Sequence, residues 1–189
     1  MVVAEDREWE YLGEFVEIYY NTMKRNRADE FYFFPIQYLQ LLKDAAGRHA
    51  TLMVARYKGK VISAAVLVEY GGIVNLFLLA THTEYLSLSP RKAVLHTSQK
   101  WAKARGNRVF HLGGGRGGRV DEPLFRFKAA FSSDYYPFYI GRWILDECAY
   151  TFLTEERRKH VANGEAKRMD PSYFPAYRAP LIEVSNQHC

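Results

Sequence analysis

The chain has 189 residues, nearly half of them hydrophobic, which is enough to bury the core of one domain and excludes an intrinsically disordered protein. A formal net charge of +5 favours an anionic partner, such as a phosphate-bearing cofactor, a nucleotide, a nucleic acid or an anionic lipid. Cys148 and Cys189 make no disulfide framework, and no Cys/His cluster has metal-ligand spacing, so we expect a cytoplasmic protein without a bound metal. The sequence shows no signal peptide and no apolar run of transmembrane length.

The first half of the chain predicts two helices followed by three strands. Apolar residues recur at helical spacing over 6–25, and a second helix runs from Pro35 to about Ala46, where Gly47 ends it. Three apolar runs joined by tight glycine turns then predict an antiparallel meander. The strands of this meander cover residues 51–57, 61–70 and 73–81.

The second half predicts alternating helices and strands. Ser89 and Pro90 form an N-cap and first-turn pair, and the helix that they begin ends at Gly106. The later elements are a strand over 109–112, a helix that Asp121 caps and Pro123 begins, a strand over 135–144, a helix over 146–161 and a packed tail over 163–189. No linker divides this order, so we predict a single α/β domain over 1–189, with a central mixed sheet and helices on both faces.

A glycine-rich loop follows the strand 109–112 and is the most informative stretch. It holds five glycines between 113 and 118, which leave the backbone free to adopt positive φ and to approach a ligand closely. The loop leads into a helix N-terminus and carries Arg116 and Arg119, a combination that suits an anion. It lacks the ending of a P-loop and the spacing of a dinucleotide-binding loop. An ordinary turn and a single RGG-type RNA-binding element remain as alternatives.

A lysine shares the apolar face of the helix that follows the loop. Leu124, Phe127, Lys128 and Phe131 lie at positions i, i+3, i+4 and i+7. A lysine on such a face is costly unless its ammonium meets an anion, has a lowered pKa or extends past the aromatic rings into water. Lys128 is therefore a candidate functional residue.

Four segments carry a resemblance to a known family. They are Tyr-Asn-Thr-Met-Lys-Arg (20–25), Phe-Tyr-Phe-Phe (31–34), His-Leu-Gly-Gly-Gly (111–115) and Leu-Phe-Arg-Phe-Lys-Ala-Ala-Phe (124–131). Together they resemble the FemAB/FemX group, the peptidoglycan interpeptide-bridge aminoacyltransferases of the GNAT acyltransferase superfamily. The resemblance implies a GNAT-like fold in which the acyl donor lies between the meander strand that ends at Thr81 and the strand before the glycine loop. It also implies that the chain corresponds to the second half of a two-domain protein.

The same resemblance implies transfer of an activated acyl or aminoacyl group to an amine, in peptidoglycan bridge formation. Ordinary GNAT members bind the pyrophosphate of coenzyme A (CoA) on a glycine-rich turn before the helix that starts here at Pro90. Those glycines are absent, although Arg91 and Lys92 remain to hold a phosphate. The donor is therefore expected to be an acyl-CoA thioester or an aminoacyl-tRNA. The acceptor is expected to be an anionic small molecule such as a nucleotide- or lipid-linked muropeptide.

The resemblance places Lys128 at the reacting centre, where a cation would stabilise an oxyanion. Phe127 would shape this site, and His111 is a candidate for proton transfer. The expected substrate-binding residues are Arg25, Thr81, Arg91, Lys92, Gly113, Gly114, Gly115 and Arg116. An acetyl-CoA-dependent N-acetyltransferase and a non-catalytic domain that binds an anion or RNA stay open as alternatives. So do a homodimer and a missing N-terminal half.

Overall fold

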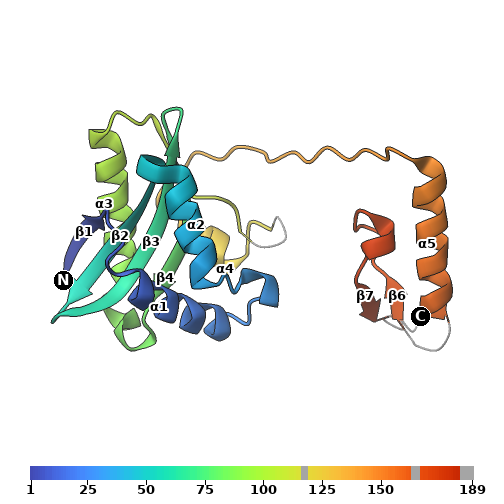
Figure 1. The fold of residues 1–189 in the computed structure, drawn as a ribbon, viewed down its shortest axis with the longest axis horizontal. Helices are drawn as coiled ribbons and strands as arrows, with labels where there is room; N and C mark the ends of the chain where they lie inside the picture. Colours follow the sequence, from blue (N-terminus) through green and yellow to red (C-terminus); the bar gives the residue numbers. More distant parts are fainter. Residues whose placement is uncertain (116–118, 163–166, 184–189) are drawn as a thin grey trace. The chain divides into compact units, whose positions relative to one another are not determined.

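The structure is a computed structural model that describes residues 1–115, 119–162 and 167–183 (Figure 1). The chain divides into two compact units, Met1–Ser133 and Asp134–Cys189. The organisation predicted from the sequence, one domain with a packed tail, stays a prediction. No helix in the described ranges is long and apolar enough to cross a membrane.

The first unit is built on a five-stranded sheet in the order β1-β2-β3-β4-β5. Its strands are β1 (Val2–Asp6), β2 (Ala50–Tyr57), β3 (Lys60–Tyr70), β4 (Ile73–Thr81) and β5 (Val109–His111). Strands β1 to β4 pair antiparallel in succession, so the predicted meander is confirmed. β5 is parallel to β4, as expected for two strands that are joined through a helix.

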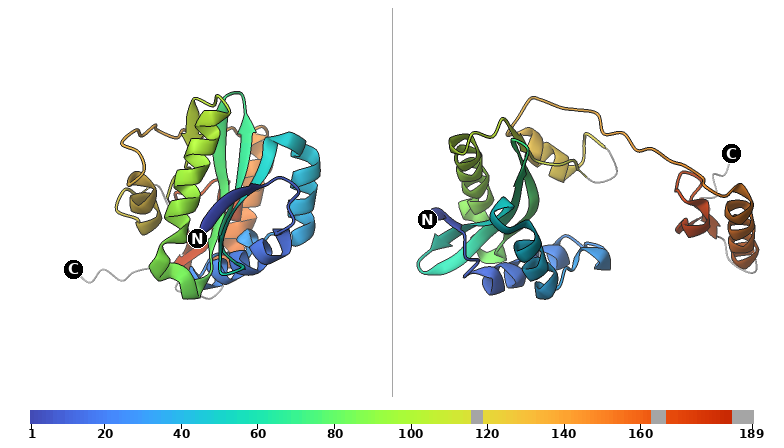
Figure 2. Two further views of the ribbon diagram at one scale, coloured as in Figure 1. Left: turned by 90° about the vertical axis from the view of Figure 1, so that its left-hand side faces the viewer. Right: turned by 45° about the horizontal axis from the view of Figure 1, so that its top comes forward.

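Helices cover both faces of this sheet (Figures 1 and 2). They are α1 (Leu12–Arg25), α2 (Ile36–Ala46), α3 (Pro90–Ala104) and the short α4 (Pro123–Ala129). Phe15 of α1 and Leu39 of α2 are fully buried against one face of the sheet, whereas Val94 and Leu95 of α3 are fully buried against the other. Each such side chain stabilises the fold by about 1.5–3 kcal/mol. The predicted α/β class, a mixed sheet between helices, is confirmed.

β4 is the strand along which the sheet divides. β5 pairs only with residues 73–75 of β4, which then continues to Thr81. In the pairing of β4 with β3 the register shifts so that Phe77 is an extra residue, and both Phe77 and Leu78 pack on the α1–α2 side. Such a bulge bends the strand and increases its twist. We call residues 76–81 of β4, which run beyond the end of β5, the β4–β5 split.

The second unit is a helix with a small hairpin. It contains α5 (Glu147–Ala162), β6 (Lys167–Met169) and β7 (Leu181–Glu183), and the two strands pair antiparallel. Tyr150 of α5 stacks on Phe174, with 5.9 Å between the ring centroids, and its hydroxyl accepts a hydrogen bond from the backbone N–H of Ala176 at 3.1 Å. These contacts hold the segment between the strands against the helix.

One predicted element begins too early and another is wrong. The helix expected over 6–25 is present and ends at Arg25, but it starts only at Leu12 and follows a strand, β1, that was not predicted. The carboxylate of Asp6 accepts hydrogen bonds from the backbone N–H groups of Glu10 and Tyr11 and so stabilises a turn before the helix. Residues 135–144, expected as a strand, form neither helix nor strand. Aromatic and β-branched composition favours a strand only where a neighbouring strand is available for pairing.

Candidate functional site

The first turn of α3 follows β4 in the chain and has no side-chain cap. Pro90 has no backbone N–H, and the N–H of Lys92 donates to the carbonyl oxygen of Ser89 at 3.0 Å. Ser89 is the N-cap residue, as predicted, but it adopts a left-handed conformation (φ 49°) and its side chain makes no capping hydrogen bond. Pro90 occupies the first turn as predicted, and Arg91 and Lys92 follow it with exposed side chains. An uncapped helix N-terminus carries a partial positive charge, and two cations beside it favour a bound anion.

The last turn of α1 is bonded to the end of β4. The hydroxyl of Thr22 donates to the carbonyl oxygen of Thr81 and accepts from its N–H, at 3.1 Å in both cases. Arg25 donates to the same carbonyl at 3.3 Å and to the hydroxyl of Thr83 at 2.7 Å. The Thr81 side chain is buried, with its hydroxyl 3.1 Å from that of Ser63. Thr81 therefore contributes backbone groups that fix α1 rather than an exposed hydroxyl.

Arg25, Arg91 and Phe127 connect three helices around the split. Burial, and in addition the positive charge of Arg91, lowers the pKa of the Arg25 guanidinium, so the two cations act on one another. The guanidinium carbon of Arg91 lies 4.2 Å from the centroid of the Phe127 ring on α4. Neither arginine forms an ion pair with a carboxylate in the described part of the chain. The pair therefore favours an anionic ligand.

Lys128 bonds the glycine loop to α4. Its Nζ donates to the carbonyl oxygen of Gly114 at 2.8 Å, and Gly113, at φ 71°, has the backbone conformation that favours glycine. The ammonium is half-buried, and burial lowers the pKa of Lys128, with a smaller opposing effect from Glu122. Nζ has three N–H donors, and the Gly114 carbonyl uses one of them.

The N-terminus of α4 explains why the loop contains glycine. Glu122 is the N-cap, and its carboxylate accepts from the backbone N–H of Phe125 at 2.9 Å. A Cβ atom at Gly115 would lie 2.6 Å from Glu122 Oε2 and 2.7 Å from Phe125 Cβ, so only glycine fits there. The prediction that Asp121 caps this helix is wrong, because its carboxylate pairs instead with Arg119 at 2.7 Å.

His111 lies at the branch point of the sheet. It is the last residue of β5 and is exposed, and its register partner on β4 is Asn75. His111 Nδ1 is 3.2 Å from Asn75 Oδ1. Sequence reasoning missed Asn75, although an amide in the otherwise apolar stretch 73–80 is a signal that was available.

The structure thus gathers most of the predicted site residues around one split. His111 contacts Asn75 of β4, Lys128 contacts the glycine loop at Gly114, and Arg91 contacts Phe127. Arg25 and Arg91 act on one another through their charges. Lys92 joins them only by its place in the first turn of α3, and Arg116 lies outside the described residues. Among the residues that are described, no group of His, Cys, Asp and Glu side chains could hold a metal ion.

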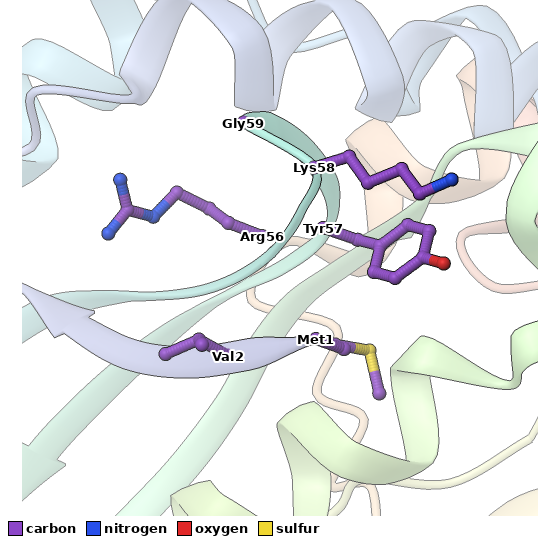
Figure 3. A pocket seen from close by; sticks show the side chains of 6 residues that line it. All are labelled: Met1, Val2, Arg56, Tyr57, Lys58 and Gly59. Atoms are coloured by element: carbon purple, nitrogen blue, oxygen red, sulfur yellow. The ribbon is translucent and has the colours of Figure 1, made fainter.

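A pocket of about 260 Å³ lies elsewhere in the first unit (Figure 3). It is lined by Met1, Val2, Arg56, Tyr57, Lys58 and Gly59. It is formed by the start of β1 and the turn between β2 and β3, and it shares no residue with the β4–β5 split. None of the candidate site residues described above lines this pocket.

Comparison with known proteins identifies the fold. A family profile described as "Acetyltransferase (GNAT) domain" matches residues 2–129. Similar solved structures include a ribosomal-protein-alanine N-acetyltransferase from Brucella melitensis biovar Abortus 2308, with 17% identity and a TM-score of 0.55 over 76% of this chain and 100% of that chain. Another is the PaiA N-acetyltransferase from Thermoplasma acidophilum in complex with coenzyme A, with 16% identity and a TM-score of 0.53 over 69% of this chain and 89% of that chain.

A third is the aminoglycoside acetyltransferase meta-AAC0020 from an uncultured soil metagenomic sample, in complex with sisomicin. It has 12% identity and a TM-score of 0.56 over 77% of this chain and 96% of that chain. At these identities the likeness to solved structures shows the fold alone. No curated protein matches the sequence.

Proposed function

The chain belongs to the acetyltransferase (GNAT) domain family, and on that basis we propose that it transfers an acyl group from an acyl-CoA thioester to the amine of an acceptor. The observation that supports this most is the group of cationic side chains around the β4–β5 split, namely Arg25, Arg91 and Lys128. The two arginines have no carboxylate partner among the described residues, and a thioester donor that carries phosphates would supply the missing negative charge.

The first turn of α3 is the proposed phosphate site. The positive end of this helix, together with the side chains of Arg91 and Lys92, would hold the pyrophosphate of CoA. Pro90 and the absence of glycines reduce the number of backbone N–H groups that reach a phosphate here, so the two side chains carry more of the binding than in a glycine-rich turn. The fold that this chain shares with a CoA-bound acetyltransferase supports CoA as the donor.

Lys128 is the proposed electrostatic catalyst. Attack of an amine on the thioester carbonyl places negative charge on the carbonyl oxygen, and a positioned cation lowers the barrier to that step. The bond to Gly114 holds Nζ in place and leaves further N–H donors for the oxyanion. Phe127, one residue earlier on α4, orients Arg91. His111 is the group in this constellation that can accept the proton of the amine.

A narrower proposal follows from the sequence resemblance to the FemAB/FemX group. In it the donor is an aminoacyl-tRNA and the acceptor is a nucleotide- or lipid-linked muropeptide. The net charge of +5 is compatible with tRNA, as it is with CoA. Both versions of the proposal place the protein in the cytoplasm, the location expected from its cysteine usage. The non-enzymatic alternative is a domain that binds RNA through its basic surface without turnover.

Thermal-shift measurements with three ligands separate these functions. Acetyl-CoA, a nucleotide-linked muropeptide and a tRNA pool are each titrated into the chain, because a ligand that binds the native state raises the unfolding midpoint. A saturable shift with acetyl-CoA supports the acyl-CoA proposal. A shift with the muropeptide, and none with acetyl-CoA, overturns it in favour of the bridge-forming version. A shift with tRNA alone that disappears steeply with salt indicates the non-catalytic RNA-binding alternative.

A further inference from the structure

The hydrogen bond between His111 and Asn75 lies at the last rung before β4 and β5 separate. The register pairs Asn75 with His111 across the two strands, and β5 ends there while β4 continues. On the other side of β4, the register partner of Asn75 is Val68 of β3, which has no polar side-chain atom. Asn75 is half-buried, so the amide lies between an apolar neighbour and an exposed imidazole.

The amide oxygen, as the partner of His111 Nδ1, favours one imidazole tautomer. The oxygen of a side-chain amide accepts hydrogen bonds and does not donate them. With Asn75 Oδ1 as the partner of His111 Nδ1 at 3.2 Å, the neutral ring would donate from Nδ1. Nε2, on the opposite edge of the ring, then carries the free lone pair. An exposed histidine without such a partner is not restricted to this tautomer.

We infer that Asn75 is a positioning residue that holds His111 with Nε2 free to accept the proton of the acceptor amine. This inference rests on the proposed acyl-transfer function. His111 Nε2 takes one proton from the ammonium group of the acceptor. The neutral nitrogen then forms a C–N bond with the thioester carbonyl carbon, the C–S bond breaks, and the second proton lost from nitrogen neutralises the departing thiolate. The products are an amide, a free thiol and protonated His111, which returns its proton to solvent.

The position of the pair agrees with this role. His111 is separated from Gly113 by one residue, and Gly113 is the glycine beside Lys128 Nζ: a Cβ there would lie 3.4 Å from that nitrogen. The proposed base is thus two residues from the glycine that the ammonium of Lys128 approaches.

Nuclear magnetic resonance tests the tautomer directly. Long-range ¹H–¹⁵N spectra at alkaline pH, where imidazoles are neutral, distinguish Nδ1–H from Nε2–H rings. We expect the Nδ1–H pattern for His111, retained in Asn75→Asp and lost in Asn75→Leu. His96, an exposed histidine on α3, is the internal reference and is expected to be unchanged in both variants. An Nε2–H pattern for His111 in the wild-type protein, or no change in Asn75→Leu, overturns the inference.

Turnover tests the role of the base. We expect His111→Gln to lower kcat by ~10²-fold or more and Asn75→Leu to lower it by ~10-fold, with KM for acyl-CoA unchanged in both. Asn75→Asp restores most of the activity, and the double variant is no worse than His111→Gln, because Asn75 acts through His111. If Asn75→Leu changes the thermal midpoint but not kcat, the pair is merely structural and the inference fails.

The spectroscopic and the turnover experiments also distinguish failure of the inference from failure of the proposed function. If acyl-CoA neither binds nor turns over, the proposed function fails and the base role fails with it, whereas the spectrum still decides the tautomer. If acyl-CoA turns over and His111→Gln has full kcat, the proposed function stands and the inference alone is overturned.

Discussion

Arg91 on α3 lies over the ring of Phe127 on α4, with its guanidinium carbon 4.2 Å from the ring centroid. This contact joins the first turn of α3, the proposed phosphate site, to the helix that carries Lys128. Phe127 also packs against the core cluster on the α3 face of the sheet. The same ring therefore supports both the packing of α4 and the orientation of Arg91.

Replacing this ring should weaken both the fold and donor binding. We expect Phe127→Leu to lower the free energy of unfolding of the first unit by about 1–2 kcal/mol, through lost packing and the lost cation–π contact. It should also weaken acyl-CoA binding several-fold, because Arg91 is no longer held in place. Urea unfolding and a binding titration measure the two effects. Arg126→Gln, an exposed change on the same helix, is the control, and equal behaviour of the two variants would contradict the assignment.

Thr22 should be more important to stability than its size suggests. Its hydroxyl satisfies both the N–H and the carbonyl of buried Thr81, where β4 has no neighbouring strand on the β5 side in the described chain. Thr22→Val retains the shape but removes both hydrogen bonds to Thr81 and the 3.4 Å bond from Arg25, and we expect a loss of about 1–3 kcal/mol in urea unfolding. Thr97→Val on α3 is the matched control, with an expected change of about 0.5 kcal/mol or less. A Thr22→Val protein as stable as the control would show that the bonds to Thr81 do not matter.

The pH dependence of turnover should report on Lys128. Burial lowers the pKa of this lysine, so its ammonium is lost at a lower pH than that of an ordinary lysine, about 10.4. If the charged form stabilises the oxyanion, kcat falls as pH rises through that lowered pKa. Lys128→Met should lose ~10²-fold or more in kcat and lack this alkaline limb. The alkaline limb is measured in the pH profile of kcat at saturating acyl donor. Lys100→Met on α3 is the control and should keep the wild-type profile. An alkaline limb that persists in Lys128→Met would assign it to another group.

Acid should weaken the junction between β3 and the turn after α3. Burial raises the pKa of the Glu69 carboxyl, but hydrogen bonds from Asn107 at 2.7 Å and Arg105 at 2.8 Å outweigh it, so the pKa is lowered. A carboxyl whose pKa is lower in the folded than in the unfolded chain stabilises the fold above its unfolded pKa. That stability is lost as pH falls through the folded-state value.

Glu69→Gln tests this junction. We expect it to lower the free energy of unfolding by about 1 kcal/mol at neutral pH, after allowance for the screening of a partly exposed pair. In acid, where the Glu69 carboxyl is protonated, the variant and the wild type should have the same free energy of unfolding. Unfolding curves measured across the acid range check the result, with the exposed Glu14→Gln as control. A constant difference between Glu69→Gln and wild type at every pH would contradict the linkage.

Local signals in the sequence predicted most of the first unit. Pro35 and Gly47 bound α2, Ser89 and Pro90 mark the start of α3, and the glycine turns delimit the meander. Each of these depends on the backbone preference of one or two residues. Elements that depend on a distant partner were the ones missed: β1 is a strand because β2 pairs with it, and 135–144 has strand-like composition without strand pairing.

The candidate site was predicted as a set of residues rather than as an arrangement. Sequence patterns identified Lys128 and the glycine loop, but not the bond from Lys128 to Gly114 that joins them. The anchoring of Arg25 to Thr81 and its proximity to Arg91 come from the packing of α1 and α3 around β4, which no local pattern encodes. Asn75 acquires its role only from the parallel register of β4 and β5.

Calorimetric titration of acetyl-CoA into the wild-type protein, Arg91→Gln and Lys100→Gln tests the central claim most directly. The claim is that phosphates of an acyl-CoA donor bind at the start of α3, beside the β4–β5 split. We predict saturable binding to the wild type that weakens with salt, is ~10-fold weaker in Arg91→Gln and is nearly unchanged in Lys100→Gln, which removes the same charge from an exposed position later on α3. Absence of binding to the wild type, or equal affinities in all three proteins, would contradict it.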